Sequence, residues 1–284
     1  MSTTVAPPPT RRELRKTKPK NLKVIAVWGS PGSGKSTIAL NLAAELAARK
    51  FKVLLIDADT HAPTQATALA LTDHPAGLAP MLRFARQGRL NPEEFDSQSI
   101  TLRSGRAQFT LIPGINPNRW PEVTPQAFEL LIEHATKQFD FVVIDSASDI
   151  ESNIYSQAHP LPRNDFTRWL IGSAEMVIAT FATDPVSISR FLVAEPEFQE
   201  LRQTRPIVLV ANRHRTTALG PAAKLQVEQT MKKLTNRKVG AFLPNDPKAQ
   251  DAALRNGTPL IGTRRSSSLR KAIAQLVRDK KLAG

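Results

Sequence analysis

The residue pattern with the most specific chemistry is a glycine-rich loop close to the start of the chain. Residues 29–37 read G-S-P-G-S-G-K-S-T and follow directly on an apolar run, Val24–Trp28. This is the G-x-x-x-x-G-K-[ST] pattern in the setting that it requires, a strand that leads through a loop into a helix. The candidate phosphate-binding residues of this loop are Gly29, Ser30, Pro31, Gly32, Ser33, Gly34, Lys35, Ser36 and Thr37.

Each part of this loop has a separate task in phosphate binding. The glycines let the backbone curl, so that successive N–H groups converge on phosphate oxygens. Lys35 adds a cation that can reach the β- and γ-phosphates, and Ser36 offers a hydroxyl to Mg²⁺. The helix that follows directs its positive end at the same place. The loop therefore predicts binding of a nucleoside triphosphate.

Three carboxylates are expected to lie beside this loop. The predicted strand Val53–Ile56 is followed by D-A-D, which places Asp57 and Asp59 at its carboxyl end. The predicted strand Phe141–Ile144 is followed by Asp145. Ligands of open α/β sheets bind outside the carboxyl ends of the strands, so these side chains can converge with Lys35. Carboxylates can hold the waters of Mg²⁺, and a further one can orient an attacking water. Capping of the strand ends by Asx turns is the alternative.

Apolar runs that alternate with helical patterns predict an α/β fold. The expected fold is that of a P-loop NTPase, a mostly parallel sheet with helices on both faces. The predicted strands are Val24–Trp28, Val53–Ile56, Phe109–Ile112, Phe141–Ile144, Met176–Phe181, Ile207–Val210 and Val239–Leu243. The predicted helices are Thr37–Lys50, Ala79–Gln87, Pro125–Lys137, Arg168–Gly172, Ser187–Leu201, Pro221–Leu234, Pro247–Asn256 and Ser267–Lys280.

Composition divides the chain into a tail and one domain. Residues 1–22 contain three consecutive prolines and a basic run, which predict a disordered basic tail. Residues 23–284 are expected to form a single P-loop ATPase domain, since the 284-residue chain is 41% apolar and can fill one large core. The polar segment Ile150–Asp165 is expected to be a long loop.

Charge and cysteine content restrict the partners and the compartment. The chain has no cysteine, which excludes disulfides and cysteine-ligated metal within it and fits a cytoplasmic protein. No apolar run reaches the length of a membrane span, and the first residues lack the apolar core of a signal peptide. The net charge of +14 favours a polyanionic partner, either nucleic acid or an anionic membrane, with solubility alone as the alternative.

The chain resembles the ParA/MinD family of P-loop ATPases from Lys23 to about Ile261. The resemblance rests on the loop, I-D-A-D and F-D-F-V-V-I-D, on T-D-P at 183–185, on V-A-N-R at 210–213 and on F-L-P-N-D-P-K-A-Q-D-A-A-L-R-N-G-T-P-L at 242–260. It implies ATP and Mg²⁺ as cofactors and an ATP-dependent homodimer. It also implies site roles: base contacts at Asn212, Arg213, Pro244 and Asp246, Mg²⁺ held by Ser36, Asp57 and Asp145, and the hydrolytic water positioned by Asp59.

One position departs from the family pattern. The family's loop reads K-G-G-x-G-K-[ST], and its early lysine reaches the phosphate of the partner subunit. Ser30 stands where that lysine is expected, while Lys35 is kept. This departure is compatible with ATP binding, but it calls dimer-coupled hydrolysis into question. Relatives of the CpaE/TadZ type, which position pili, vary at this loop, and the chain could belong to that branch.

Bacterial tyrosine kinases offer a second resemblance. They share P-G-x-G-K-S-T followed by I-D-A-D, also without the early lysine. They carry an arginine where this chain has His61, and a C-terminal tyrosine cluster where this chain has Tyr155 alone. A nucleotide-binding scaffold with little hydrolysis is the third alternative.

The end of the chain carries a basic cluster and an apolar stripe. Arg264, Arg265, Arg270 and Lys271 are candidate contacts to DNA phosphates, because ParA-type relatives bind nonspecific DNA in this region; a solvated helix start is the alternative. Leu269, Ile273, Leu276 and Val277 recur at helical spacing. We expect this stripe to pack against the sheet, although MinD-like relatives use a closing helix to bind membranes.

Together these features predict a cytoplasmic switch ATPase, associated with the nucleoid or the membrane where its basic surface binds. Hydrolysis of ATP to ADP and phosphate is expected to be slow and stimulated by a partner. The switch would position a cellular cargo, with a role in DNA partition, in pilus or secretion machinery, or at the division site. The stimulating partner is expected to be a cargo protein or another protein.

Overall fold

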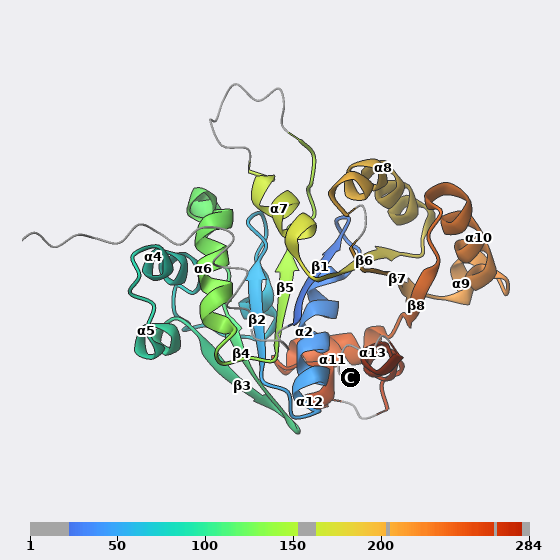
Figure 1. Ribbon diagram of the computed structural model, residues 1–284. Helices are drawn as coiled ribbons and strands as arrows, with labels where there is room; N and C mark the ends of the chain where they lie inside the picture. Colours follow the sequence, from blue (N-terminus) through green and yellow to red (C-terminus); the bar gives the residue numbers. More distant parts are fainter. Residues whose placement is uncertain (1–22, 153–162, 203–204, 264–265, 280–284) are drawn as a thin grey trace, which may run out of the picture.

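An eight-stranded sheet in the order β3-β4-β2-β5-β1-β6-β7-β8 forms the centre of the computed structural model (Figure 1). The structure describes residues 23–152, 163–202, 205–263 and 266–279. Its strands are β1 Lys23–Gly29, β2 Val53–Ala58, β3 Ile100–Ser104, β4 Ala107–Ile112, β5 Phe141–Ser146, β6 Met176–Ala182, β7 Ile207–His214 and β8 Val239–Pro244.

The strand that leads into the glycine-rich loop is central. β1 pairs in parallel with β5 on one side and with β6 on the other. All neighbouring strands are parallel except β3 and β4, which form an antiparallel hairpin at one edge. In register, Asp145 of β5 lies opposite Val27 and opposite Asp57 of β2. The parallel arrangement therefore gathers the carboxyl ends of β1, β2 and β5 at one edge of the sheet.

Helices cover both faces of the sheet (Figure 1). One layer contains α2 Lys35–Ala47, α11 Pro247–Arg255, α12 Leu260–Thr263 and α13 Ser268–Asp279. The other contains α4 Leu78–Arg86, α5 Pro92–Ser97, α6 Pro125–Ala135, α7 Asp165–Ser173, α8 Pro185–Arg202 and α10 Ala223–Thr235. The short elements α3 Gln65–Ala68, η1 Pro117–Glu122 and α9 Thr216–Leu219 lie in connecting segments.

Strand β1 shows how the two layers are filled. Ile25 and Val27 belong to the core under α2, whereas Ala26 and Trp28 belong to the core of the opposite layer. This division follows from the alternation of side chains along a strand. Trp28 is fully buried and stacks on Phe198 of α8, with ring centroids 4.5 Å apart. Both faces of the central strand are apolar for this reason, which explains its continuous hydrophobic run.

The seven predicted strands are all present, and the predicted fold class is confirmed. Strand β3 was not predicted, because the prediction followed apolar runs, whereas Ile100 and Leu102 alternate with polar residues in the pattern of a half-buried strand. The predicted apolar stripe of α13 is buried, as expected. The predicted tail, 1–22, and most of the predicted loop, at 153–162, lie outside the described residues.

An ionic network joins the closing helix α13 to α2. Glu45 of α2 is buried, and its Oε1 accepts a hydrogen bond from Arg270 Nε at 2.8 Å. Arg49 Nη1 lies 3.2 Å from Glu45 Oε2, and its Nη2 donates to the carbonyl of Ala274 at 2.9 Å. A buried carboxylate requires such partners, because its desolvation is otherwise very costly. Arg270, a candidate DNA contact, is thus engaged within the fold, and a phosphate would have to compete with Glu45 for it.

We expect replacement of Arg270 by Gln to lower the free energy of unfolding by about 2 kcal/mol, because Glu45 loses one of its two cations. Urea unfolding measures this change. Lys271→Gln, at the adjacent and exposed position, is the control and should change stability by less than about 0.5 kcal/mol. Equal effects of the two substitutions would contradict a stabilising role for the network.

Candidate functional site

The glycine-rich loop leaves β1 at Gly29 and enters α2 at Lys35. Gly32 and Gly34 have φ values of 80° and 86°, a region that favours glycine. A Cβ placed on Gly29 would lie 2.3 Å from the carbonyl oxygen of Thr180 on β6. Any other residue at Gly29 would therefore push the loop away from the sheet. The positive φ values and the close contact with β6 together restrict the loop backbone to one compact conformation.

Asn212, at the end of β7, supports this loop from the side. Its Nδ2 donates to the carbonyl oxygen of Ser33 at 2.7 Å, and its Oδ1 accepts from Arg213 N at 2.8 Å. A Cβ on Gly34 would lie 2.4 Å from the same Nδ2. The base contacts that the resemblance implies for Asn212 and Arg213 stay predictions. The contact with Ser33 was not foreseen, since only the tertiary fold places residue 212 against residue 33.

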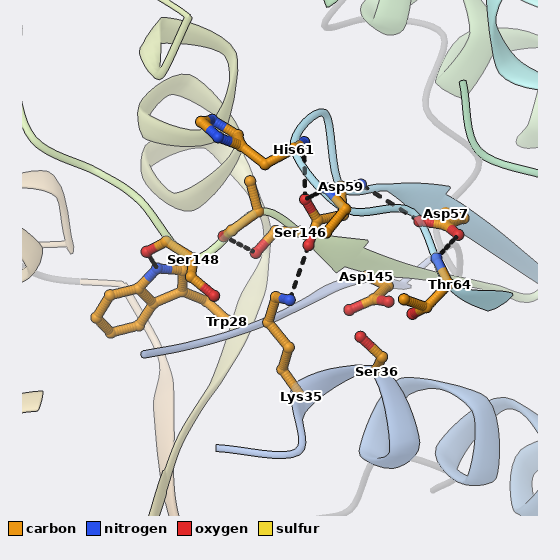
Figure 2. Close-up of polar contacts among 12 residues, drawn as sticks. Trp28, Lys35, Ser36, Asp57, Asp59, His61, Thr64, Asp145, Ser146 and Ser148 are labelled. Atoms are coloured by element: carbon orange, nitrogen blue, oxygen red, sulfur yellow. Dashed lines mark hydrogen bonds and ion pairs between the residues drawn. The ribbon is translucent and has the colours of Figure 1, made fainter. Parts of the chain in front are cut away.

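Lys35 forms an ion pair with Asp59, and Figure 2 shows the two side chains pointing toward each other. Lys35 Nζ lies 2.8 Å from Asp59 Oδ2, and both side chains are largely buried. Burial opposes the charged ammonium, but the carboxylates of Asp145 and Asp59 outweigh it and raise the pKa of Lys35. The other carboxylate oxygen of Asp59 accepts from the backbone N–H groups of His61 and Ala62, both at 2.9 Å. Asp59 therefore connects Lys35 to the loop that follows β2.

Asp57 holds the end of this same loop. Its Oδ2 accepts from the backbone N–H groups of Thr64 and Gln65, both at 2.9 Å, where the short helix α3 begins. Burial, reinforced by repulsion from Asp145, raises the pKa of Asp57 above its usual range. These two contacts cap the start of α3, while the Asx turn that was the alternative for this residue corresponds to the contact of Asp59 N with Asp57 Oδ1 at 3.4 Å. Its role toward Mg²⁺ stays a prediction.

Asp145 lies at the bottom of the site and is completely buried. Its Oδ2 accepts from Gln65 Nε2 at 2.8 Å, while its Oδ1 has no hydrogen-bond partner. Burial raises the pKa of Asp145, although Lys35 and Gln65 act in the opposite direction. The side chain of Ser36 points toward this carboxylate (Figure 2). Gln65 was not predicted as a site residue, and nothing in its local sequence pattern distinguishes it.

The donor set at Asp145 fits a magnesium ion. Mg²⁺ binds oxygen ligands and is usually held by one or two carboxylates, a hydroxyl and nucleotide phosphates. Ser36 supplies the hydroxyl and Asp145 the carboxylate, with one buried oxygen still unpartnered. These two residues would hold the ion, directly or through its waters. When bound, Mg²⁺ would neutralise charge on the phosphates.

A cavity of about 230 Å³ adjoins the start of α2. Ser36, Thr37 and Gln65 line one side of it, and Gln250 and Leu254 of α11 line the other. The phosphate loop thus opens beside a recess with both polar and apolar walls.

The remaining predicted site residues lie at the end of β8, at the start of α11 and in the basic cluster near α13. Asp246 accepts from Ala249 N at the start of α11 and from the hydroxyl of Ser267 at 2.9 Å, so its carboxylate joins α11 to the segment before α13. Pro244 ends β8. Their proposed contacts to the base stay predictions. Lys271 is exposed, whereas Arg264 and Arg265 lie outside the described residues.

This combination of strand, glycine-rich loop, helix and buried carboxylates defines a P-loop nucleoside triphosphatase. Residues 24–260 match the family model described as the CobQ/CobB/MinD/ParA nucleotide binding domain, and the chain belongs to this family. The predicted ParA/MinD resemblance is confirmed, and ATP with Mg²⁺ are the cofactors of this family.

Among curated relatives, the septum site-determining protein MinD of Synechocystis is 24% identical over 241 residues, which is 85% of this chain and 82% of that protein. The tyrosine-protein kinase CpsD of Streptococcus pneumoniae is 29% identical over 134 residues, but the match covers 44% of this chain and 53% of the kinase. The MinD-type match therefore spans most of both chains, whereas the kinase match spans about half of the kinase.

Solved structures of the family's members share the fold, and two of them illustrate the likeness. A ParA family ATPase from Chlorobium tepidum superposes with a TM-score of 0.73 at 19% identity, covering 92% of this chain and 99% of that one. MinD from Pyrococcus horikoshii, complexed with Mg-ADP, gives a TM-score of 0.67 at 19% identity, covering 93% and 98%.

We expect Asn212→Ala to weaken binding of a fluorescent ATP analogue about fivefold. The carbonyl of Ser33 loses its partner, a loss of about 1 kcal/mol, and the phosphate loop becomes less ordered. Fluorescence titration measures the affinity. Asn256→Ala, at the exposed C-terminal end of α11, serves as the control. Unchanged affinity in Asn212→Ala would show that the loop keeps its course without this support.

Proposed function

We propose that the protein is an ATP-dependent, dimerising switch ATPase of the ParA/MinD type that positions a cellular cargo. The observation that carries this proposal is the ion pair between Lys35 and Asp59 at 2.8 Å. An incoming γ-phosphate would compete with Asp59 for Lys35, because both are anions within reach of the same ammonium. Nucleotide binding would then free Asp59 to position a water for hydrolysis.

The loop that Asp59 organises contacts the segment before α7, so that a change in the loop could be transmitted to that segment. His61 Nε2 lies 3.2 Å from Asn164 Oδ1, just before α7. Asn164 Nδ2 in turn donates to the carbonyl of Glu151 at 3.1 Å. A change at Asp59 would therefore reach the segments on either side of residues 153–162. Such ordering and release of loops by a γ-phosphate is a known form of nucleotide switching.

The partners are proposed from the family and from charge. The MinD relative is a septum site-determining protein by name, and the matching cargo here would be a division component, DNA, or pilus or secretion machinery. The net charge of +14 and the exposed Lys271 and Arg278 support contact with DNA or an anionic membrane surface. Among the described residues, no helix has the length and apolarity to cross a membrane. We propose a cytoplasmic location with nucleoid or membrane association.

The dimer is tested by measuring molar mass with light scattering in ATP, in ADP and without nucleotide. We expect a dimer with ATP alone. Lys35→Ala should remain a monomer in all three conditions, because the phosphates lose their main cation. A native protein whose mass is the same with and without ATP would contradict the dimerising switch.

Ser30 offers a test of hydrolysis. The family's loop carries a lysine at this position, and here Ser30 is buried with no partner for its hydroxyl. We expect Ser30→Lys to raise phosphate release about tenfold in the ATP-bound dimer, because a cation would reach the partner's phosphate. Ser30→Met, similar in length but uncharged, is the control. Equal rates in both variants would contradict a charge effect.

The tyrosine kinase is a second candidate, because the match to CpsD includes 29% identity over 134 residues. Incubation with γ-labelled ATP separates the two functions. A switch ATPase is expected to release the label as free phosphate. The release should be slow for the protein alone and faster when DNA, vesicles or a cargo protein is added. A kinase transfers label to tyrosine. Binding of ATP without either product would identify the protein as a nucleotide-binding scaffold.

A further inference from the structure

Gln65 connects three parts of the phosphate site. Its backbone N–H donates to Asp57 Oδ2 at 2.9 Å. Its side-chain Nε2 donates to Asp145 Oδ2 at 2.8 Å and to the backbone carbonyl of Ser36 at 3.0 Å. Gln65 is 1% exposed, so the amide is removed from water. A buried amide with contacts to the ends of β2 and β5 and to the start of α2 is well placed to fix their relative positions.

Two oxygen atoms in this arrangement have no partner. Gln65 Oε1 and Asp145 Oδ1 are both buried, and neither accepts a hydrogen bond. They belong to side chains that are joined directly through Nε2 and Oδ2. An unpartnered buried acceptor costs about 1–3 kcal/mol, so one on each of two hydrogen-bonded side chains indicates a place for water or a cation. The hydroxyl of Ser36 points toward the same carboxylate (Figure 2).

We propose that Gln65 is a positioning residue of the Mg²⁺ site. Through Nε2 it orients Asp145, and through Oε1 it accepts a hydrogen bond from a water of the bound ion. This inference rests on the proposed function, because it requires that the nucleotide binds together with Mg²⁺. Such outer-shell partners orient the ligands of a metal and influence its affinity.

Gln65 would also connect a bound metal ion to the loop that carries Asp59. The residue begins α3, whose first backbone N–H groups are held by Asp57 rather than by a side chain of the helix itself. An ion that recruits Gln65 would therefore hold the C-terminal end of the segment 59–65 in place. Occupancy of the metal site would order this segment as well as neutralise phosphate charge.

The test is the affinity for Mn²⁺, used as a paramagnetic substitute for Mg²⁺, in the complex with an ATP analogue. We expect Gln65→Leu, which has a similar volume but lacks both the donor and the acceptor of the side-chain amide, to weaken Mn²⁺ binding by about tenfold or more. Electron paramagnetic resonance measures free Mn²⁺. Affinity for the analogue in EDTA should fall by no more than about threefold, since the phosphate loop loses only the hydrogen bond to the Ser36 carbonyl.

Gln250→Leu is the matched control. Gln250 lines the same cavity from α11 and should leave Mn²⁺ affinity unchanged. If Gln65→Leu does not fold, Gln65→Asn replaces it. Asn keeps the amide on a shorter side chain, and a weaker Mn²⁺ affinity at unchanged melting temperature would support the proposal.

The outcomes separate this inference from the proposed function. Wild-type protein that binds no ATP analogue would overturn both. Wild-type protein that binds the analogue with Mn²⁺, together with variants of unchanged Mn²⁺ affinity, would overturn the role of Gln65 alone. A parallel loss of affinity for Mn²⁺ and for the analogue in EDTA would reduce Gln65 to a structural residue and would also overturn this role.

Discussion

The structure depends on one electrostatic constraint, the burial of three carboxylates around a single lysine at the edge of the sheet. Asp57, Asp59 and Asp145 end neighbouring strands or follow them, and in the described residues Lys35 is the cation that faces this group. Each carboxylate is stabilised by backbone or amide N–H groups, yet burial and mutual repulsion still raise the pKa of Asp57 and Asp145. Such a site favours any ligand that brings further positive charge, which is what Mg²⁺ supplies.

The remaining elements maintain this arrangement. Parallel pairing places Asp145 beside both β1 and β2, because register fixes which residues are adjacent. Asn212 holds the phosphate loop from β7, and Gln65 holds the opposite side from α3. Large apolar cores on both faces keep the sheet rigid beneath the loop.

Much of this could be predicted from the sequence, and the exceptions have physical causes. The loop, the carboxylates and the seven buried strands have local signals, because phosphate binding and two-sided burial both restrict residue types. Gln65 and Asn212 form their contacts across 80 and 179 residues of chain, to Asp145 and Ser33. Helix α3 was missed because it has only four residues and its first N–H groups are capped by Asp57, at the end of the preceding strand β2, rather than by its own N-cap side chain. Arg270 appeared as a surface cation because its partner Glu45 is 225 residues away.

The network of Glu45, Arg49 and Arg270 has a mechanical consequence. An ion pair links helix α13 to α2, the helix whose first turn contains Lys35 and Ser36 of the glycine-rich loop. Detaching α13 would expose its apolar stripe and leave a buried carboxylate with one cation fewer. The two helices are therefore expected to move as one rigid body. A partner that displaces the C-terminal helix would therefore also displace the start of α2 and the nucleotide site beside it.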